Sequence, residues 1–330
     1  MSGGGSVWYQ MRPNKFVDRS LFVECLGISV SAVGAHKYVY ASMGASHLVD
    51  HHAVYQRLGI RSLFSFDQNQ ISLERQLVNR PIDTCICQKM DSKELPDHLS
   101  TLLDLFDDAS NVAVWLDYTS AERFQQLSEF ENVLGECAPG DVCRITMNSD
   151  VRNIGGLGDR WKRDKFKSPG AFRADRLRTG LGHYFESSFK EVEEDAIPIV
   201  LAHAVRIACS RAELRCQGVT FIPVLITTYK DGQRMFTATV YAAGEGGAPP
   251  PIRSWEYLAS DWLDVLDIDV PELSTREKIL IDNVLSQDAA HILQHLSFVP
   301  ANDEIIAARS LESYKKLHRF VPAFYHIDVR

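Results

Sequence analysis

Residues 219–241 read VTFIPVLITTYKDGQRMFTATVY and hold the clearest fold signal in the sequence. Two runs rich in β-branched and aromatic residues, 219–229 and 234–241, flank the turn Lys230-Asp231-Gly232-Gln233. An Asp-Gly pair between such runs is typical of a β-hairpin, because glycine adopts the positive φ that a tight turn requires. The sequence therefore predicts two antiparallel strands late in the chain.

The segment before this hairpin alternates between strand and helix patterns. Short runs of apolar, β-branched and aromatic residues predict five strands, at 37–41, 62–66, 84–88, 112–116 and 141–147. Strands joined by helical crossovers form a parallel sheet that helices cover on both faces. We therefore expect an α/β, Rossmann-like, mixed seven-stranded sheet, parallel except for an antiparallel strand from the C-terminal hairpin.

Length and composition are those of a globular chain with additions to one core domain. The chain has 330 residues, of which 45% are hydrophobic and 24% are charged, close to the globular average. We expect a tail and helix at 1–29, the sheet domain at 30–245, and a small helical region at 252–330.

The seven cysteines are scattered and odd in number, which is typical of reduced thiols. With no apolar run long enough for a membrane span and no secretory signal pattern, we expect a cytoplasmic protein.

The net charge of −8 is unevenly distributed along the chain. Residues 151–180 form a basic insertion with nine basic and three acidic residues, a formal charge of +6, and it includes Arg163 and Lys165. Its glycines and single proline predict an irregular segment. Aromatic residues are interleaved with the cations, as in proteins that bind single-stranded nucleic acid: Trp161, Phe166 and Phe172. A solvated loop that pairs with the acidic C-terminal segment, within the chain or between subunits, is the alternative.

Polar residues follow the first four predicted strands, at the edge where open α/β sheets bind their ligands. The first strand runs into the small-residue turn Ser42-Met43-Gly44-Ala45-Ser46. Asp67 ends the second strand, 23 residues after Gly44, close to the spacing of about 20 expected for an acid that binds ribose hydroxyls. A helix N-cap is the alternative for Asp67, and an exposed loop acid is the alternative for Asp91 after the third strand. Asp117 and Tyr118 end the fourth strand.

The order of elements and three motifs carry a family resemblance. The motifs are Tyr9-Gln10-Met11-Arg12-Pro13-Asn14-Lys15, then Leu63-Phe64-Ser65-Phe66-Asp67 with Arg75-Gln76-x-x-Asn79-x-Pro81, and Trp115-Leu116-Asp117-Tyr118. With these motifs, residues 8–150 resemble bacterial proteins grouped as putative O-methyltransferases. The whole order of strands resembles class I S-adenosylmethionine-dependent methyltransferases, whose seventh strand lies antiparallel beside the fifth.

The resemblance implies S-adenosylmethionine as cofactor and a set of site residues. The cofactor-binding candidates are Ser42, Gly44, Ser46, Asp67 and Asp91. The catalytic candidates are Asp117 and Tyr118. From the residues themselves, Arg12, Asn14 and Lys15 at the start of the first helix are substrate-binding candidates, since cations near a helix start favour an anion, and ordinary capping and salt bridging are the alternative. Arg163 and Lys165 of the basic insertion are further substrate-binding candidates. The acceptor is then a small molecule or a nucleic acid bound through the basic insertion, and a partner protein or a second copy of the chain is a further expectation.

Departures from the family pattern leave two other functions open. The chain has Ser-x-Gly-x-Ser where the family has Gly-x-Gly-x-Gly, and Tyr40 replaces the usual acidic residue before this turn. The first alternative is a catalytically inactive binding or assembly subunit of a larger bacterial complex. The second, favoured by Arg12, Lys15 and the basic insertion rather than by these departures, is a nucleotide-processing enzyme on the same sheet. We expect no metal site, because adjacent His51 and His52 point in different directions on a helix and Cys85-x-Cys87 lacks the spacing of a zinc site.

Overall fold

An eight-stranded sheet forms the centre of the fold, in the order β3-β2-β1-β4-β5-β7-β6-β8. The structure is a computed structural model that describes residues 12–154, 158 and 160–322. The strands are β1 (Tyr38–Ser42), β2 (Ser62–Asp67), β3 (Ile86–Lys89), β4 (Asn111–Asp117), β5 (Val142–Asn148), β6 (Thr220–Asp231), β7 (Gln233–Ala243) and β8 (Leu266–Ile268). Strands β1 to β5 are parallel, and β7 runs antiparallel to β5. The Rossmann-like prediction is therefore confirmed.

The predicted count of seven strands is wrong by one. The extra strand, β8, has only three residues. A run of three residues is too short to show the alternation by which a strand is recognised in a sequence, so its place at the edge next to β6 comes from tertiary structure alone.

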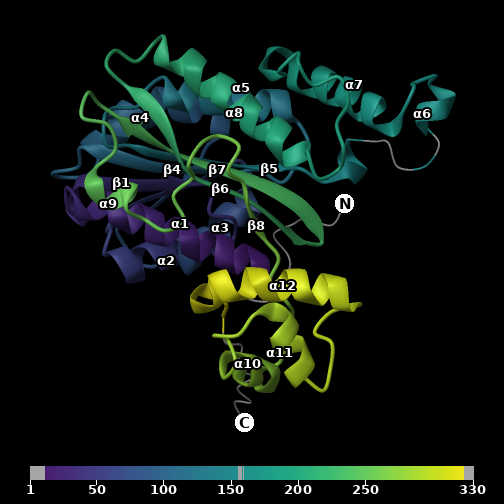
Figure 1. Cartoon of the computed structure of the whole chain (residues 1–330). Helices are drawn as coiled ribbons and strands as arrows, with labels where there is room; N and C mark the ends of the chain where they lie inside the picture. The colour runs from purple at the N-terminus through teal and green to yellow at the C-terminus, as the bar shows by residue number, and fades with distance from the viewer. Residues whose placement is uncertain (1–11, 155–157, 159, 323–330) are drawn as a thin grey trace. The chain divides into compact units, whose positions relative to one another are not determined.

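Helices cover both faces of the sheet. Helices α4 (Leu95–Asp104), α5 (Arg123–Leu134) and α8 (Ile197–Glu213) lie on one face, and α1 (Pro13–Ser31), α2 (Val49–Leu58) and α3 (Gln70–Asn79) lie on the other (Figure 1). The remaining helices are α6 (Arg160–Arg163), α7 (Pro169–Leu181), α9 (Pro250–Arg253), α10 (Thr275–Asp282), α11 (Ala289–His295) and α12 (Glu304–Leu317). This two-sided cover explains why β4 and β5 are almost wholly buried.

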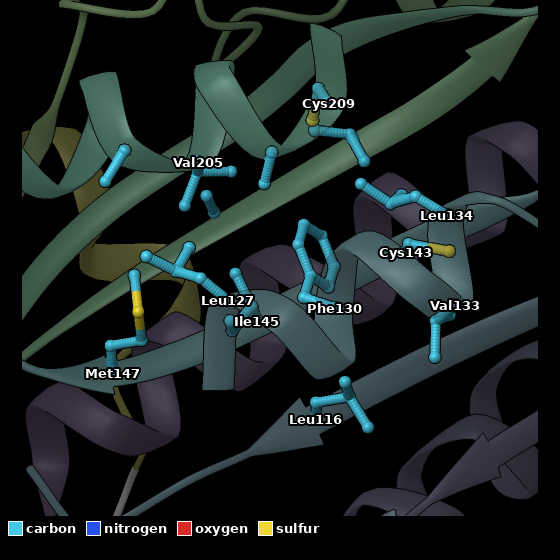
Figure 2. Packing of buried hydrophobic residues seen from close by; sticks show 14 of the residues in the cluster. Leu116, Leu127, Phe130, Val133, Leu134, Cys143, Ile145, Met147, Val205 and Cys209 are labelled. Carbon is cyan, nitrogen blue, oxygen red and sulfur yellow. The ribbon is translucent and has the colours of Figure 1, made fainter. Parts of the chain in front are cut away.

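The main core lies between the central strands and helices α5 and α8. Figure 2 shows Phe130 of α5 among Leu116, Ile145 and Val205, and all four side chains are completely buried or nearly so. Two cysteines, Cys143 and Cys209, belong to the same buried cluster (Figure 2). Burial on this scale is the dominant stabilising contribution in folding, and it holds the strands whose carboxyl ends carry the candidate site.

The basic insertion contains more regular structure than its sequence indicates. Glycines and Pro169 predict an irregular segment, yet α7 occupies Pro169–Leu181. Ser168 caps this helix by accepting a hydrogen bond from the N–H of Ala171, and Pro169 stands at the first helical position, where its missing N–H costs nothing. The proline is therefore a helix-start signal here, and the prediction of an irregular insertion is wrong for this part.

The chain forms two compact units. Among the described residues, the first contains 22–228 and 233–266, and the second contains 12–21, 229–232 and 267–322. The first unit contains β1 to β5 and their loops. In the second, Ser274 and Glu277 form a capping box at the start of α10, each accepting a hydrogen bond from the other's N–H.

Candidate functional site

The candidate site lies at the carboxyl ends of β1, β2 and β4. Ser42, the last residue of β1, is level with Ser65 of β2 and with Trp115 of β4. Asp67 and Asp117 each stand two residues further along their strands. The two carboxylates therefore flank the loop that follows Ser42, as the sequence predicts for the ligand-binding edge of an open α/β sheet.

The loop after β1 turns through a left-handed residue that only glycine suits. Gly44 has a φ of 65°, and a Cβ atom built on it would lie 2.4 Å from Leu48 Cδ2 and 2.6 Å from Ser65 Oγ. Ser42 is buried, and its hydroxyl accepts a hydrogen bond from the N–H of Gly44 at 3.4 Å. The glycine therefore lets the loop lie against the side chains below it.

Side chains of α3 fix this loop from one side. The Gln76 amide donates to the carbonyl of Met43 at 3.0 Å, and the Asn79 amide donates to the carbonyl of Ser46 at 2.8 Å. Arg75 Nη2 lies 3.2 Å from His47 Nε2. The motif Arg75-Gln76-x-x-Asn79, part of the family resemblance, thus has a structural role that the sequence did not reveal. These three contacts, to Met43, Ser46 and His47, hold the loop in one conformation.

A buried polar network lies beneath the same loop. Tyr40 donates its hydroxyl hydrogen to Asp50 Oδ2 at 2.7 Å, and Asp50 Oδ1 is 3.4 Å from His51 Nδ1. The other ring nitrogen of His51 is 3.0 Å from the carbonyl of Phe64. An acid from α2 thus reaches Tyr40 in the middle of β1, the residue that stands in place of the acid expected before the turn.

The pKa of His51 reflects this network. Burial alone would lower the pKa of the imidazole, but the charge of Asp50 and the hydrogen bonds to Asp50 and to the Phe64 carbonyl outweigh burial and raise the pKa above its ordinary value. His52 Nε2 lies 2.7 Å from the carbonyl of Asn79. Each imidazole thus has a backbone carbonyl within hydrogen-bond distance of one ring nitrogen.

Asp67 does not cap the helix that follows it. The N-cap of α3 is Asn69, whose side chain accepts hydrogen bonds from the N–H groups of Ile71 and Ser72. Asp67 Oδ1 accepts one hydrogen bond, from the N–H of Asn69 at 2.8 Å, and the residue is half-buried. The N-cap alternative for Asp67 is therefore wrong, and its carboxylate has acceptor capacity left for a ligand.

Asp91 has a structural role at the end of β3. It caps the short 3₁₀ helix Ser92–Glu94, where Asp91 and Glu94 form a capping box. Asp91 Oδ1 accepts from the N–H of Lys93 at 3.2 Å. This hydrogen bonding positions the Asp91 carboxylate in the loop beyond β3 and uses part of its acceptor capacity.

Asp117 and Tyr118 lie next to each other at the end of β4, and the Tyr118 hydroxyl is hydrogen-bonded to Glu129. Asp117 ends β4 opposite Thr146 of β5 and is half-buried. The Tyr118 hydroxyl donates to Glu129 Oε2, which also accepts from the Ser92 hydroxyl at 2.6 Å. Burial and the charge of Glu129 raise the pKa of Tyr118 above its ordinary value. Sequence reasoning missed Glu129, because a buried acid inside a helix carries no distinctive local signal.

The N-terminal candidates belong to the second unit. The Asn14 amide donates to Asp231 Oδ1 at 3.1 Å, and Asn14 Oδ1 accepts from the N–H of Val270 at 2.8 Å. The N–H of Lys15 donates to Asp231 Oδ2 at 2.7 Å. Burial raises the pKa of Asp231 despite these bonds and the nearby charge of Arg12. Asn14 therefore joins three segments of the unit, while Arg12 and Lys15 stay substrate-binding predictions.

The basic insertion places its two candidates differently. Arg163 lines a cavity together with Arg152, Arg160 and Arg176. Lys165 is exposed and has a left-handed φ of 60°; it is not among the residues that line this cavity.

The described part of the chain contains neither a cluster of side chains arranged to bind a metal nor a helix suited to span a membrane. In residues 12–154, 158 and 160–322, no group of three or more His, Cys, Asp or Glu side chains has the arrangement of a metal site. Within the same residues, no helix combines the length and apolar character that crossing a membrane requires.

Comparison with known proteins decides the family. The model of the family described as "Putative O-methyltransferase" matches residues 7–329, nearly the whole chain. The chain belongs to this family. The resemblance seen in the sequence motifs is thus confirmed for the family as a whole, and it extends over both units. No curated protein matches the sequence.

Solved structures similar to this O-methyltransferase family member are distant from it. An O-methyltransferase from Bacillus cereus in complex with SAH is 13% identical, and the match covers 72% of this chain and 84% of that chain with a TM-score of 0.37. The 16S rRNA (adenine(1408)-N(1))-methyltransferase from Catenulisporales acidiphilia is 11% identical, with coverages of 67% and 91% and a TM-score of 0.34. Family membership therefore rests on the family model, not on these likenesses.

Proposed function

We propose that this member of the O-methyltransferase family transfers a methyl group from S-adenosylmethionine to an oxygen of its acceptor. The observation that carries the proposal is the meeting of the fixed loop after β1 with Asp67 and Asp117 at one edge of the sheet. All seven cysteines are free thiols, which supports a reducing compartment such as the bacterial cytoplasm.

The residues at this edge fit the chemistry of an adenosyl ligand. Asp67 has a carboxylate oxygen to accept from the ribose hydroxyls, because Asn69 rather than Asp67 caps α3. The loop Ser42–Ser46 would lie along the amino-acid part of the cofactor, and Asp91 would face the adenine. In the bound state the cofactor supplies an electrophilic methyl group.

Asp117 is the better candidate for a role at the acceptor oxygen. Methyl transfer forms a carbon–oxygen bond and breaks a carbon–sulfur bond, and the acceptor's proton must pass to a base. Asp117 stands at the end of β4 beside the loop after β1. Tyr118 is less suited, because its hydroxyl is hydrogen-bonded to Glu129 and its pKa is raised. We assign Asp117 to accept or orient the acceptor hydroxyl and Tyr118 to position the loop after β3 through Glu129, which also accepts from Ser92.

The experiment is a calorimetric titration with S-adenosylhomocysteine, on the parent protein and two variants. Asp67→Asn removes the charge that would bind the ribose. Asp104→Asn is the matched control, because Asp104 is an exposed acid at the last residue of α4. Charge-assisted hydrogen bonds contribute about 1.5–3 kcal/mol, so we expect Asp67→Asn to weaken binding roughly 10- to 150-fold. The control should bind like the parent.

Two results would contradict the proposal. Absence of saturable binding by the parent at millimolar S-adenosylhomocysteine would contradict the cofactor itself. Equal affinity of the parent and Asp67→Asn would contradict the assignment of the ribose site. Tight binding without methyl transfer to any oxygen acceptor would favour a non-catalytic binding subunit, the alternative that the Ser-x-Gly-x-Ser loop supports.

A further inference from the structure

Four arginines from three segments converge on one cavity in the first unit. The cavity, of about 240 Å³, is lined by Arg152 of the 3₁₀ turn Val151–Asn153, by Arg160 and Arg163 of α6, and by Arg176 of α7. Among the lining residues that the structure describes, Asp164 is the one carboxylate. Such a concentration of guanidinium groups is typical of sites that bind phosphate or carboxylate groups.

Two walls of this arginine cavity are fixed by buried contacts. Asp150 is buried and accepts from Arg152 Nε at 2.8 Å and from Arg152 Nη2 at 2.6 Å. It also accepts from the N–H of Arg234 in β7. These hydrogen bonds, first of all those from the Arg152 side chain, lower the pKa of Asp150 to about 2, so the carboxylate stays charged near neutral pH. Arg152 is thereby anchored to the sheet.

The other fixed wall is α7. Arg173 is buried, and it donates to the carbonyl of Val192 at 2.7 Å and to Glu193 at 2.8 Å. Arg176 lies three residues further along the same helix and is exposed. Because Arg173 ties α7 to the following segment, the backbone that carries Arg176 does not need to order on binding a ligand.

The charge of the cavity is not balanced from within the described part of the chain. Asp150 neutralises Arg152, and Asp164 lies 3.2 Å from Arg163 on the same exposed turn. Among the residues that the structure describes, no carboxylate pairs with Arg160 or Arg176. Among these described residues, the guanidinium groups of Arg160 and Arg176 are left without a carboxylate partner, and their charges favour an anion in the cavity.

The aromatic residues of the insertion are not arranged to stack nucleic-acid bases. Phe172 is buried, and its ring packs edge-on against Phe166 with 5.1 Å between centroids. Trp161 is half-buried, with Lys162 Nζ 5.4 Å from its ring centroid. Single-stranded nucleic acid needs accessible aromatic faces beside its phosphates. The geometry thus favours one terminal phosphate over a nucleic-acid backbone.

We propose that the arginine cavity binds the phosphate group of a phosphorylated small molecule and so selects the methyl acceptor. The selection of an acceptor rests on the proposed function. The insertion leaves the sheet after β5, whose carboxyl end lies beside that of β4. A phosphate held there anchors one end of the acceptor while its hydroxyl reaches the edge at Asp117.

The test is a calorimetric titration with inorganic phosphate and with pyrophosphate, at low salt in a buffer free of other multivalent anions. Arg160→Gln and Arg176→Gln each remove one guanidinium that has no carboxylate partner among the described residues, and circular dichroism checks that each variant folds. Arg178→Gln is the matched control: it removes the same charge from α7, but Arg178 does not line the cavity. We expect saturable phosphate binding that weakens at least about tenfold in the first two variants and changes less than about twofold in the control.

The outcomes separate this proposal from the proposed function. No saturable phosphate binding at millimolar concentration, or equal weakening in Arg178→Gln, overturns the phosphate site. A short single-stranded RNA that binds through Arg160 and Arg176 far more tightly than phosphate does also overturns it, in favour of a nucleic-acid acceptor. S-adenosylhomocysteine is titrated in parallel. Its failure to bind while phosphate still binds contradicts methyl transfer and leaves the phosphate site standing.

Discussion

Substituting Gly44 tests the conformation of the loop after β1. Gly44 has a φ of 65°, and alanine in this left-handed region costs about 1–2 kcal/mol. The new methyl group would lie 2.4 Å from Leu48 Cδ2 and 2.6 Å from Ser65 Oγ, and such overpacking costs about 1–3 kcal/mol. We therefore expect Gly44→Ala to lower the free energy of unfolding by roughly 2–5 kcal/mol.

The neighbouring residue supplies the matched control. Ala45 also has a left-handed φ, of 46°, so Ala45→Gly removes strain where Gly44→Ala adds it. Urea denaturation of both variants gives the free energies of unfolding, and titration with S-adenosylhomocysteine shows whether the loop still binds. We expect Ala45→Gly to be as stable as the parent or more stable, and Gly44→Ala to bind the ligand more weakly. Parental stability and affinity in Gly44→Ala would refute the described loop conformation.

Three further substitutions test contacts at the carboxyl edge of the sheet. Asn79→Ala removes the hydrogen bond to the loop carbonyl and should cost about 1–2 kcal/mol in urea denaturation, together with weaker S-adenosylhomocysteine binding; unchanged affinity would contradict the role of α3. His51 has a raised pKa beside Asp50, so its contribution to stability is fully present below its unfolded pKa of about 6.5 and is lost as the pH rises through the higher folded pKa. In the His51→Gln variant, the free energy of unfolding should no longer fall for this reason between about pH 6 and 8. The same fall with pH in the variant and the parent would contradict a raised pKa of His51. Tyr118→Phe removes a hydrogen bond to Glu129, and this should lower the free energy of unfolding by about 1–2 kcal/mol. The rate of methyl transfer should change little. A large loss of rate with unchanged stability would instead make Tyr118 catalytic.

The sheet was predictable because its strands carry strong local patterns. Strand β4 is an almost unbroken apolar run, and the Asp-Gly turn between β6 and β7 has a distinctive composition. Strand β8 and helix α7 were not predictable in the same way. The three residues of β8 are too few to show periodicity. A proline such as Pro169 is found both at helix starts and at helix breaks, so its presence in the sequence does not distinguish the two.

The candidate site was predictable in position but less so in detail. The ends of β2 and β4 placed Asp67 and Asp117 at one edge, since parallel strands end together. The roles of Gln76 and Asn79 depend on α3 folding over the β1 loop, and the link from Tyr40 to Asp50 spans ten residues. No local pattern encodes contacts of this kind. The same holds for Asn14, whose partners Asp231 and Val270 lie more than 200 residues away.

A crystal structure with S-adenosylhomocysteine tests the central claim most directly. The account predicts that the ribose hydroxyls lie within hydrogen-bond distance of the Asp67 carboxylate and that the homocysteine part lies along Ser42–Ser46, with the sulfur facing the end of β4 near Asp117. A ligand bound away from the carboxyl ends of β1, β2 and β4 would contradict the account.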